Sequence, residues 1–439
     1  MSAVQGWVDT FRAEAQRLPG AKLPWLAGAR ARAIERFAAL GWPTNKLEKW
    51  RHTSLALLAQ QEFAVPPVDR VDLAAGALAQ LRQGAEAGHW LVFIDGQFAP
   101  GLSDIGTLPA GACVDSLAGA LAQRPERLEA VYGDAEEGES PAALNLALAG
   151  DGAYIELARG VAIEAPIHLV FVGGVSKGTQ LVRNFIVADD GAQVTVVEHY
   201  IGRDDATSFT NTVTRVRAGR DARVTHLKLQ QESAQAFHLA ALDAVQARGA
   251  YFASHSLAFG ARLARNDISS RLEGEGGEAL LNGLYHVDGK RHVDHYTRLD
   301  HNSPRCTSRE LYRGILDGTG RGVFTGRIYV APGAVKTDAE QRSDSLLLSA
   351  GAESDARPEL EIYNDDVKCA HGSTVGQIDE TGLFYLRSRG LDEQHARNLL
   401  VYAFAAEVLA RIGERSLRRS AEAAIRARIP GGQLLEALA

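Results

Sequence analysis

Apolar positions in the first part of the chain follow a helical period. Phe11 and Leu18 fall on one stripe of a helix, and charged residues fill the positions between them. From about residue 90 the pattern is mixed: residues 90–95 are typical of a strand that ends in a turn, and residues 117–128 predict a short helix. We therefore expect residues 1–150 to form an N-terminal helical and mixed region.

The middle of the chain, from about 150 to 375, alternates short β-like runs with turns. Leu227 and Leu229 alternate with His226 and Lys228, the period of two that a half-buried strand shows. A turn followed by a small residue also recurs, mostly every 28–30 residues, at Ala153, Ala192, Ala222, Ala250, Ala279, Gly322 and Ala352. Such a repeat without a helical period favours a β-solenoid, whose coils bury their inner faces against one another. The alternative is a β-sandwich with coincidental turn spacing.

Helices return after residue 376. Asp379 and Asp392 are suited to cap helix N-termini, and Gly390 is suited to end the first of these helices. Helical spacing continues over residues 399–409, and an arginine-rich last helix is expected at about 415–428. The predicted fold is mainly β with helical ends: an N-terminal region 1–150, a solenoid core 151–375 and a C-terminal helical domain 376–439.

Composition and charge exclude several classes of protein. The chain has 439 residues, 46% hydrophobic and 23% charged, which are values of a folded protein. The net charge is −7, from 47 Lys and Arg against 54 Asp and Glu, and it disfavours nucleic acid as a partner. No apolar signal segment precedes Asp9 and no apolar run is long enough to cross a bilayer, so we expect a cytoplasmic protein without a membrane partner.

The cysteines limit the metal chemistry of the chain. Cys113, Cys306 and Cys369 are too sparse for a disulfide framework. Three cysteines also cannot supply a four-cysteine zinc site or iron–sulfur cluster.

Catalytic motifs are not apparent. Residues 274–279 match the letters of a dinucleotide-binding loop, but no helix start follows and Glu275 and Glu278 would face the phosphates, so a solenoid turn explains them better. Residues 173–179 lack the spacing of a phosphate-binding loop, and there is no nucleophile elbow or helical zinc motif. We expect a chain that is not an enzyme and has no catalytic residue.

Five metal-capable side chains lie within a short stretch: His286, His292, Asp294, His295 and His301. In a strand, His292 and Asp294 would point to one face and His295 to the other. We therefore expect core or solvated histidines rather than one tight metal site.

Cys369 and His371 form the sharpest local pair. On a strand they share one face, about 6.5–7 Å apart, and both side chains can bind iron or zinc. Two ligands cannot complete a cluster, so any such site must take further ligands from another chain.

Several ordered segments give the last third of the chain a family resemblance. They are the stretches 336–341, 346–349, 358–362, 365–372 and 384–390, joined near the start by 43–53. Together they resemble the SufB/SufD family of iron–sulfur cluster assembly proteins. Where the SufB branch carries a key cysteine, this chain has Leu386, which favours the SufD branch.

The resemblance implies a right-handed parallel β-helix with helical ends, acting as an accessory scaffold with a SufB-like subunit and a SufC-like ATPase. The family's histidine linked to cluster formation matches His371, with Cys369 beside it. It implies iron or a transient cluster shared with the SufB-like partner, and no permanently bound cofactor. The ATPase is expected to dock on the C-terminal helices, with Leu383, Phe384, Tyr385, Arg387, Leu399, Leu400 and Phe404 as candidate docking residues.

Two other interpretations remain open from the sequence. A β-solenoid enzyme, such as a polysaccharide lyase or an acyltransferase, would show a secretion signal or a six-residue repeat, and neither is seen. A chain expressed without partners could also pair with itself through free strand edges, giving a homodimer.

Overall fold

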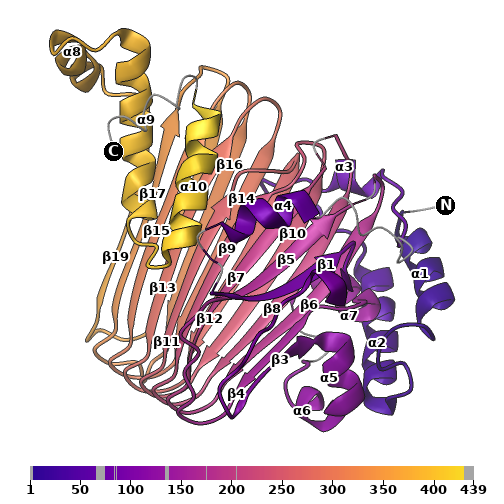
Figure 1. The fold of residues 1–439 in the computed structure, drawn as a ribbon. Helices are drawn as coiled ribbons and strands as arrows, with labels where there is room; N and C mark the ends of the chain where they lie inside the picture. The colour runs from indigo at the N-terminus through magenta and orange to yellow at the C-terminus, as the bar shows by residue number, and fades with distance from the viewer. Residues whose placement is uncertain are drawn as a thin grey trace.

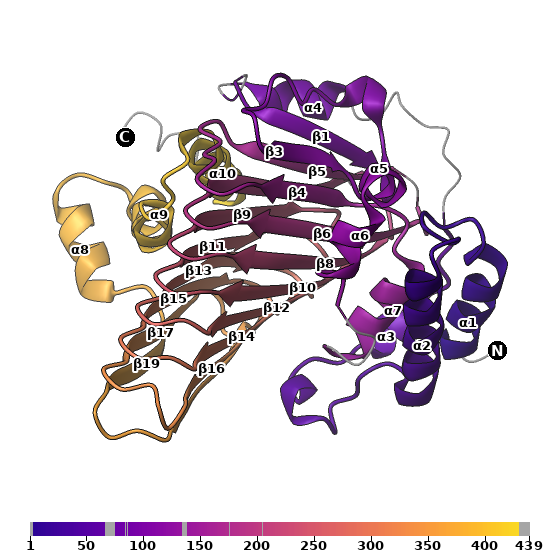
Figure 2. The same cartoon turned by 90° about the horizontal axis from the view of Figure 1, so that it is seen from below.

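The computed structural model describes residues 3–65, 75–83, 85, 87–133, 138–174, 176–203 and 205–429. Two long sheets face each other along most of this length (Figures 1 and 2). The first sheet contains β1 (His89–Ile94), β2 (Gln97–Phe98), β5 (Ile167–Gly173), β7 (Gln193–Gly202), β9 (Arg223–Gln231), β11 (Tyr251–Ala258), β13 (Glu278–Val287), β15 (Thr307–Leu316), β17 (Asp338–Leu347) and β19 (Lys368–Gly376). The second contains β3 (Ala112–Ser116), β4 (Ala153–Leu157), β6 (Thr179–Ala188), β8 (Phe209–Ala218), β10 (Phe237–Gln246), β12 (Leu263–Leu272), β14 (His292–His301), β16 (Arg321–Val330) and β18 (Glu353–Ile362).

Successive strands alternate between the two sheets. From β4 to β19 each strand pairs in parallel with the strand two places later in the chain, so each coil gives one strand to each sheet. This is a parallel β-solenoid with helices at both ends, and the predicted fold class is confirmed. The sheets begin before residue 151, because β1 pairs with β5 and β3 pairs antiparallel with β4.

The turns before the first-sheet strands follow a clearer repeat than the sequence showed. At six of these turns, from the one before β7 to the one before β17, a residue with positive φ precedes a small inward residue. It recurs every 27–31 residues, at Gly191, Asp221, Gly249, Gly276, Arg305 and Lys336. The register aligns Ala279 with Phe252, so Gly277, not Ala279, is the counterpart of Ala250. Ala153 and Gly322 lie on strands of the second sheet, and Ala352 directly precedes another, so the predicted series mixed the two sides of the coil.

The lumen between the sheets is filled mainly by apolar side chains, but two aromatic rings need glycine beside them. Tyr312 pairs in register with Gly283, and Tyr285 pairs with Gly314. A Cβ on Gly283 would lie 2.1 Å from the ring of Tyr312, and one on Gly314 would lie 2.4 Å from that of Tyr285. Each glycine therefore leaves the space that the ring of the neighbouring coil occupies.

Strand β9 was predicted to be half-buried, and this is wrong. Leu227 and Leu229 pack outward in a cluster with the C-terminal helices. His226 and Lys228 point into the lumen and are also buried. The helices cover Leu227 and Leu229 on the outer face, so the middle of the strand lies away from water on both faces, while Arg223 at its start is exposed.

Most of the N-terminal helices cover the second sheet, whereas α4 and η2, whose bounds are given below, pack against β1 and β5 of the first sheet. The helices on the second sheet share an apolar cluster with its residues Phe209, Phe237, Leu239 and Leu263, and Figure 2 shows them gathered beside it. The helices of this part are α1 (Ala3–Glu14), α2 (Pro24–Leu40), η1 (Glu48–Trp50), α3 (Ala56–Ala59), α4 (Ala75–Arg82), η2 (Pro100–Leu102), α5 (Leu117–Gln123), α6 (Pro125–Glu129) and α7 (Ser140–Leu148).

Three C-terminal helices complete the described chain: α8 (Glu380–Ser388), α9 (Glu393–Leu409) and α10 (Arg415–Arg428). Helices α9 and α10 lie over the outer face of the first sheet, while α8 projects away from it (Figure 1). Asp379 and Asp392 cap α8 and α9 as predicted. Residues 430–439 of the predicted C-terminal domain lie outside the described part. Among the described helices, none is long and apolar enough to cross a membrane.

Candidate functional site

The last coil of the solenoid forms an open end. Strands β18 and β19 are the final strands of the two sheets, so each has a sheet partner on one side only. Most side chains of β19 are exposed, and three apolar ones near this end are Ile362, Tyr363 and Val375, which are 40%, 61% and 49% exposed. An uncovered strand edge with apolar side chains is suited to receive another chain.

Cys369 and His371 lie on β19, on the face that continues the lumen. Their register partners on β17 are Ala339, which belongs to the solenoid core, and Gln341. Cys369 is half-buried against that core, whereas His371 is exposed. The pair is therefore placed together on one face at the open end, as its spacing predicts.

The Cys369 thiol is not prepared for metal binding within this chain. Burial raises its pKa, opposed by a hydrogen bond from the backbone of Ala339, so the thiol is neutral near pH 7. Among the described residues no group of three or more His, Cys, Asp or Glu side chains could hold a metal ion. Two side chains at an open end can contribute to a cluster site but cannot form one.

A polar row leads inward from His371. His371, Gln341 and Glu310 occupy the same register position on β19, β17 and β15. Gln341 Nε2 donates to Glu310 Oε2 at 2.6 Å. Burial raises the pKa of Glu310 to about 7, so this carboxyl group titrates near neutral pH, two strands in from the exposed β19.

The histidine-rich stretch divides between the two faces of β14. Thr53 contacts His292 Nε2 at 2.9 Å and also donates to Asp294, on the outer face. His295 points inward and packs between the rings of Tyr285 and Tyr312. These residues do not form one metal site, as the alternation of a strand predicts.

The candidate docking residues differ in exposure. Phe384 and Tyr385 on α8 are 74% and 56% exposed, and Arg387 is exposed beside Glu393 at 3.5 Å. Leu383, by contrast, is buried.

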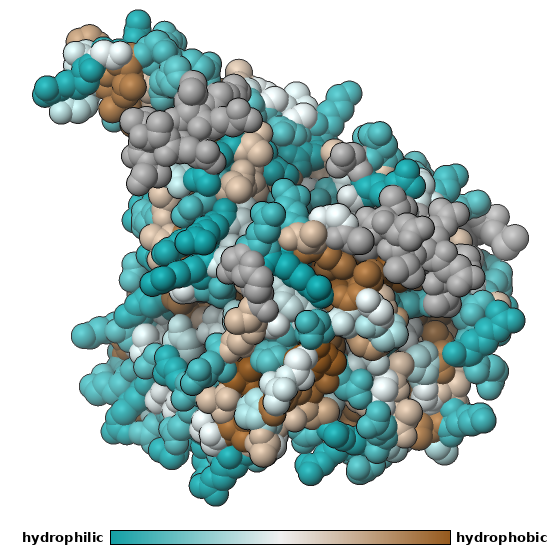
Figure 3. Space-filling model, viewed as in Figure 1, coloured by the Kyte–Doolittle hydropathy of each residue, from teal (hydrophilic) through white to brown (hydrophobic). Residues whose placement is uncertain are grey.

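The candidate docking residues on α9 are less exposed than those on α8. Leu399, Leu400 and Phe404 are half-buried in the cluster that joins the helices to the first sheet. Arg313 of β15 donates to the Phe404 carbonyl at 2.6 Å and lies 4.6 Å from its ring. The exposed part of the candidate docking set is therefore on α8, where Figure 3 shows hydrophobic surface at the projecting tip.

Comparison with known protein families agrees with this architecture. A model of the SufBD core domain, of the SUF system for FeS cluster assembly, matches residues 171–404, and a model of the SufBD N-terminal region matches residues 1–169. The chain belongs to the SufBD family. The resemblance inferred from the sequence is confirmed, and membership of this family places the chain in iron–sulfur cluster assembly.

SufBD relatives match this chain over different lengths. It is 34% identical to the iron–sulfur cluster assembly protein SufD of Escherichia coli, over 98% of both chains. An iron–sulfur cluster assembly SufBD family protein of Synechocystis is 31% identical, over 90% of this chain and 89% of its own. The SufD protein of Bacillus subtilis is 30% identical, over 61% of this chain and 62% of its own.

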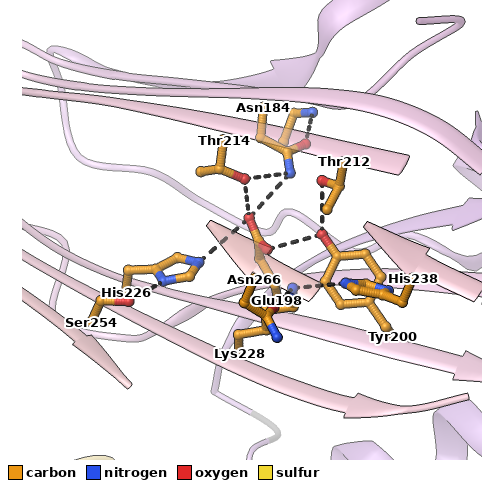
Figure 4. Close-up of polar contacts among 11 residues, drawn as sticks. Asn184, Glu198, Tyr200, Thr212, Thr214, His226, Lys228, His238, Ser254 and Asn266 are labelled. Carbon is orange, nitrogen blue, oxygen red and sulfur yellow. Dashed lines mark hydrogen bonds and ion pairs between the residues drawn. The ribbon is translucent and has the colours of Figure 1, made fainter. Parts of the chain in front are cut away.

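The SufBD core of this chain also holds a buried charged network that the sequence did not predict (Figure 4). Glu198 of β7 accepts hydrogen bonds from Thr214 at 2.5 Å, Asn184 at 3.1 Å and Tyr200 at 2.9 Å, and lies 3.5 Å from His226. Burial would raise the pKa of Glu198, but the electrostatic attraction of nearby His226 and Lys228 and the hydrogen bond from Thr214 hold it at about 2. The carboxylate is therefore charged inside the lumen.

The second half of the network surrounds Lys228. Its Nζ lies 2.7 Å from His238 Nε2 and donates to Asn266 Oδ1 at 2.7 Å. His238 Nδ1 in turn lies 2.7 Å from Glu232. Burial lowers the pKa of Lys228 to about 8, opposed by the charges of Glu198 and Glu232.

These contacts run from one sheet to the other across the lumen. Glu198 and Lys228 belong to the first sheet, and Thr214, His238 and Asn266 to the second. In the sequence, His226 and Lys228 alternate with leucines, a pattern that places the leucines inside and these two residues outside. The structure shows the reverse. The residue types alone did not indicate that the charged side chains of Glu198 and Lys228 lie inside the lumen.

Proposed function

We propose that this chain is an accessory scaffold subunit that assembles an iron–sulfur cluster at the open end of its solenoid, together with a SufB-like subunit. The observation that carries the proposal is the placement of Cys369 and His371 on the inward face of the uncovered terminal coil. The cluster is cargo built between two chains, since this chain offers two ligands there and a cluster needs more.

The same geometry supports a non-enzymatic role for the chain. Its contribution is one or two donor atoms and a stiff surface, and ATP hydrolysis would come from a SufC-like ATPase docked on the C-terminal helices. A rearrangement of that ATPase would act through α9, whose Phe404 carbonyl is bonded to Arg313 of the solenoid. ATP would then shift the population of open and closed states at the shared interface.

Substitution of His371 tests the proposal. The chain is co-expressed with a SufB-like and a SufC-like partner, and iron and acid-labile sulfide per complex are measured together with the absorption spectrum. We expect His371→Ala to leave the complex assembled and to lower the cluster content several-fold. Ser373→Ala is the matched control, because Ser373 is exposed on the same face of β19. An unchanged cluster content would remove His371 from the mechanism.

A further inference from the structure

A partly open cavity of about 350 Å³ lies outside the solenoid, between the second sheet and the N-terminal region. Its floor is the outer face of the second sheet from β8 to β14, and its wall is formed by Lys49, Trp50 and helix α7. Cavities of this size between two parts of a chain are typical places for small ligands. The cavity shares no lining residue with the Cys369 and His371 site.

The wall of the cavity is held rigidly. Trp50 is buried, and the guanidinium of Arg265 stacks on its ring at 3.9 Å. Arg265 also pairs with Asp294, which accepts a hydrogen bond from Thr53. Because these side chains hold one another, the cavity is formed before any ligand arrives, which reduces the entropy cost of binding.

The floor has an apolar part and a cationic part. Val213 and Ala241 are register partners on β8 and β10, and Leu239 precedes them on the same face. Two residues further along the strands, the same face carries Arg215 and Arg298. Two residues along a strand span about 6.6 Å, so the apolar and cationic parts are separated by the length of a small bicyclic ring system.

The cationic part retains donors for a ligand. Arg271 bonds both oxygens of Asp243 through Nη2 alone. Arg298 contacts Asp300 through Nε, at 2.8 Å. The lining as a whole has six cationic side chains and four carboxylates, so it carries an excess of positive charge.

We propose that this cavity binds a small organic anion with an apolar, ring-sized body and a carboxylate head. The body would lie over Val213, Leu239 and Ala241, and the head would accept hydrogen bonds from Arg271 and Arg298. Arginine is suited to this, because its planar group matches a carboxylate with two parallel hydrogen bonds. The site is separate from the proposed cluster interface, and its test does not require the partners.

A titration of the full-length chain with two probes tests the site. 2-Naphthoate has the proposed form, and 2-naphthamide has the same ring system without the charge. We expect calorimetry to show one naphthoate per chain, bound at least tenfold more tightly than naphthamide. Ala241→Phe places a ring on the apolar floor and should abolish binding of both probes, with the thermal unfolding midpoint confirming that the variant folds.

Two arginine variants distinguish specific anion binding in the cavity from non-specific electrostatic attraction to the surface. Arg298→Gln should weaken naphthoate binding about tenfold and leave naphthamide unchanged. Arg321→Gln is the matched control: both arginine side chains are 38% exposed and pair with an aspartate, but Arg321 is outside the cavity. It should leave both probes unchanged.

Three results would overturn the proposal. They are no binding of naphthoate, equal affinity for the two probes, and the same loss in Arg321→Gln as in Arg298→Gln. Should Ala241→Phe fail to fold, the probe comparison and the two arginine variants decide the question without it.

Discussion

Charged side chains inside the solenoid behave differently from those on its surface. Glu198 is buried and faces His226 across 3.5 Å, whereas Asp190 and Arg220 form an ion pair on the surface. Removing one partner of a buried pair leaves an uncompensated charge in a medium of low polarity. The same change at the surface exposes the remaining charge to water, which solvates it.

Glu198→Ala should therefore lower the free energy of unfolding by about 3–5 kcal/mol. The measurement is urea denaturation followed by circular dichroism. Asp190→Ala is the control and should change the midpoint little, because its pair with Arg220 is exposed. Equal effects of the two variants would show that the lumen network does not stabilise the fold.

Glu310 makes stability depend on pH. Burial raises its pKa from 4.5 to about 7, so the folded protein binds a proton that the unfolded chain releases. The stability that this proton contributes to the folded state is fully present below pH 4.5 and is lost as the pH rises to about 7. Glu310→Gln should remove that loss. Between pH 5 and pH 8 the free energy of unfolding of the variant should therefore rise by about 2–3 kcal/mol relative to that of the wild type.

The exposed neighbour of Glu310 supplies the comparison. Glu340 lies on β17 with its side chain 62% exposed, and Glu340→Gln should leave the pH dependence unchanged. Urea midpoints at pH 5 and pH 8 give the answer for both variants. A parallel pH profile for Glu310→Gln and the wild type would contradict the assignment.

Among the elements, α8 carries the exposed apolar surface of the C-terminal region. Phe384 is 74% exposed on a helix that projects from the sheets, so it contributes little to the folded core. Phe384→Asp should abolish capture of a SufC-like ATPase in a pull-down and leave the thermal midpoint unchanged. Leu40→Asp changes a side chain that is 57% exposed in the N-terminal region and should retain binding. Retained binding after truncation at residue 376 would refute docking on these helices altogether.

Local signals predicted elements well where they act within a few residues. The caps at Asp379 and Asp392 were predicted because their side chains bond backbone groups two or three residues away. The helix expected over 117–128 is instead divided into α5 and α6 at Pro125. Proline has no backbone N–H to continue the first helix, and it is suited to begin the second.

At the scale of the whole molecule, the open end is the feature that most needs a partner. A second copy that covered the terminal coil would bury Val375, which is 49% exposed on its inward face. We expect the isolated chain to self-associate, and Val375→Lys to weaken that association at least tenfold because a buried lysine charge is costly. Sedimentation velocity over a concentration series measures it, with Leu40→Lys as the control. A monomer at all concentrations would contradict self-pairing through this end.

Several features of this protein could be predicted from residues that are close together in the sequence. The presence of short strands and turns, the helix caps and the shared face of Cys369 and His371 all depend on positions close together in the chain, so the local sequence pattern was enough to predict them. Ordered family segments then placed the chain among iron–sulfur cluster assembly proteins.

Burial and register required the folded molecule. Whether Lys228 or Leu227 faces the lumen depends on what covers the outer side of β9, and that cover is a helix almost two hundred residues away. The row from His371 to Glu310 likewise exists because three coils stack in register. Such relations join residues that are distant along the chain, and the local pattern of polarity is the same whichever face is inside.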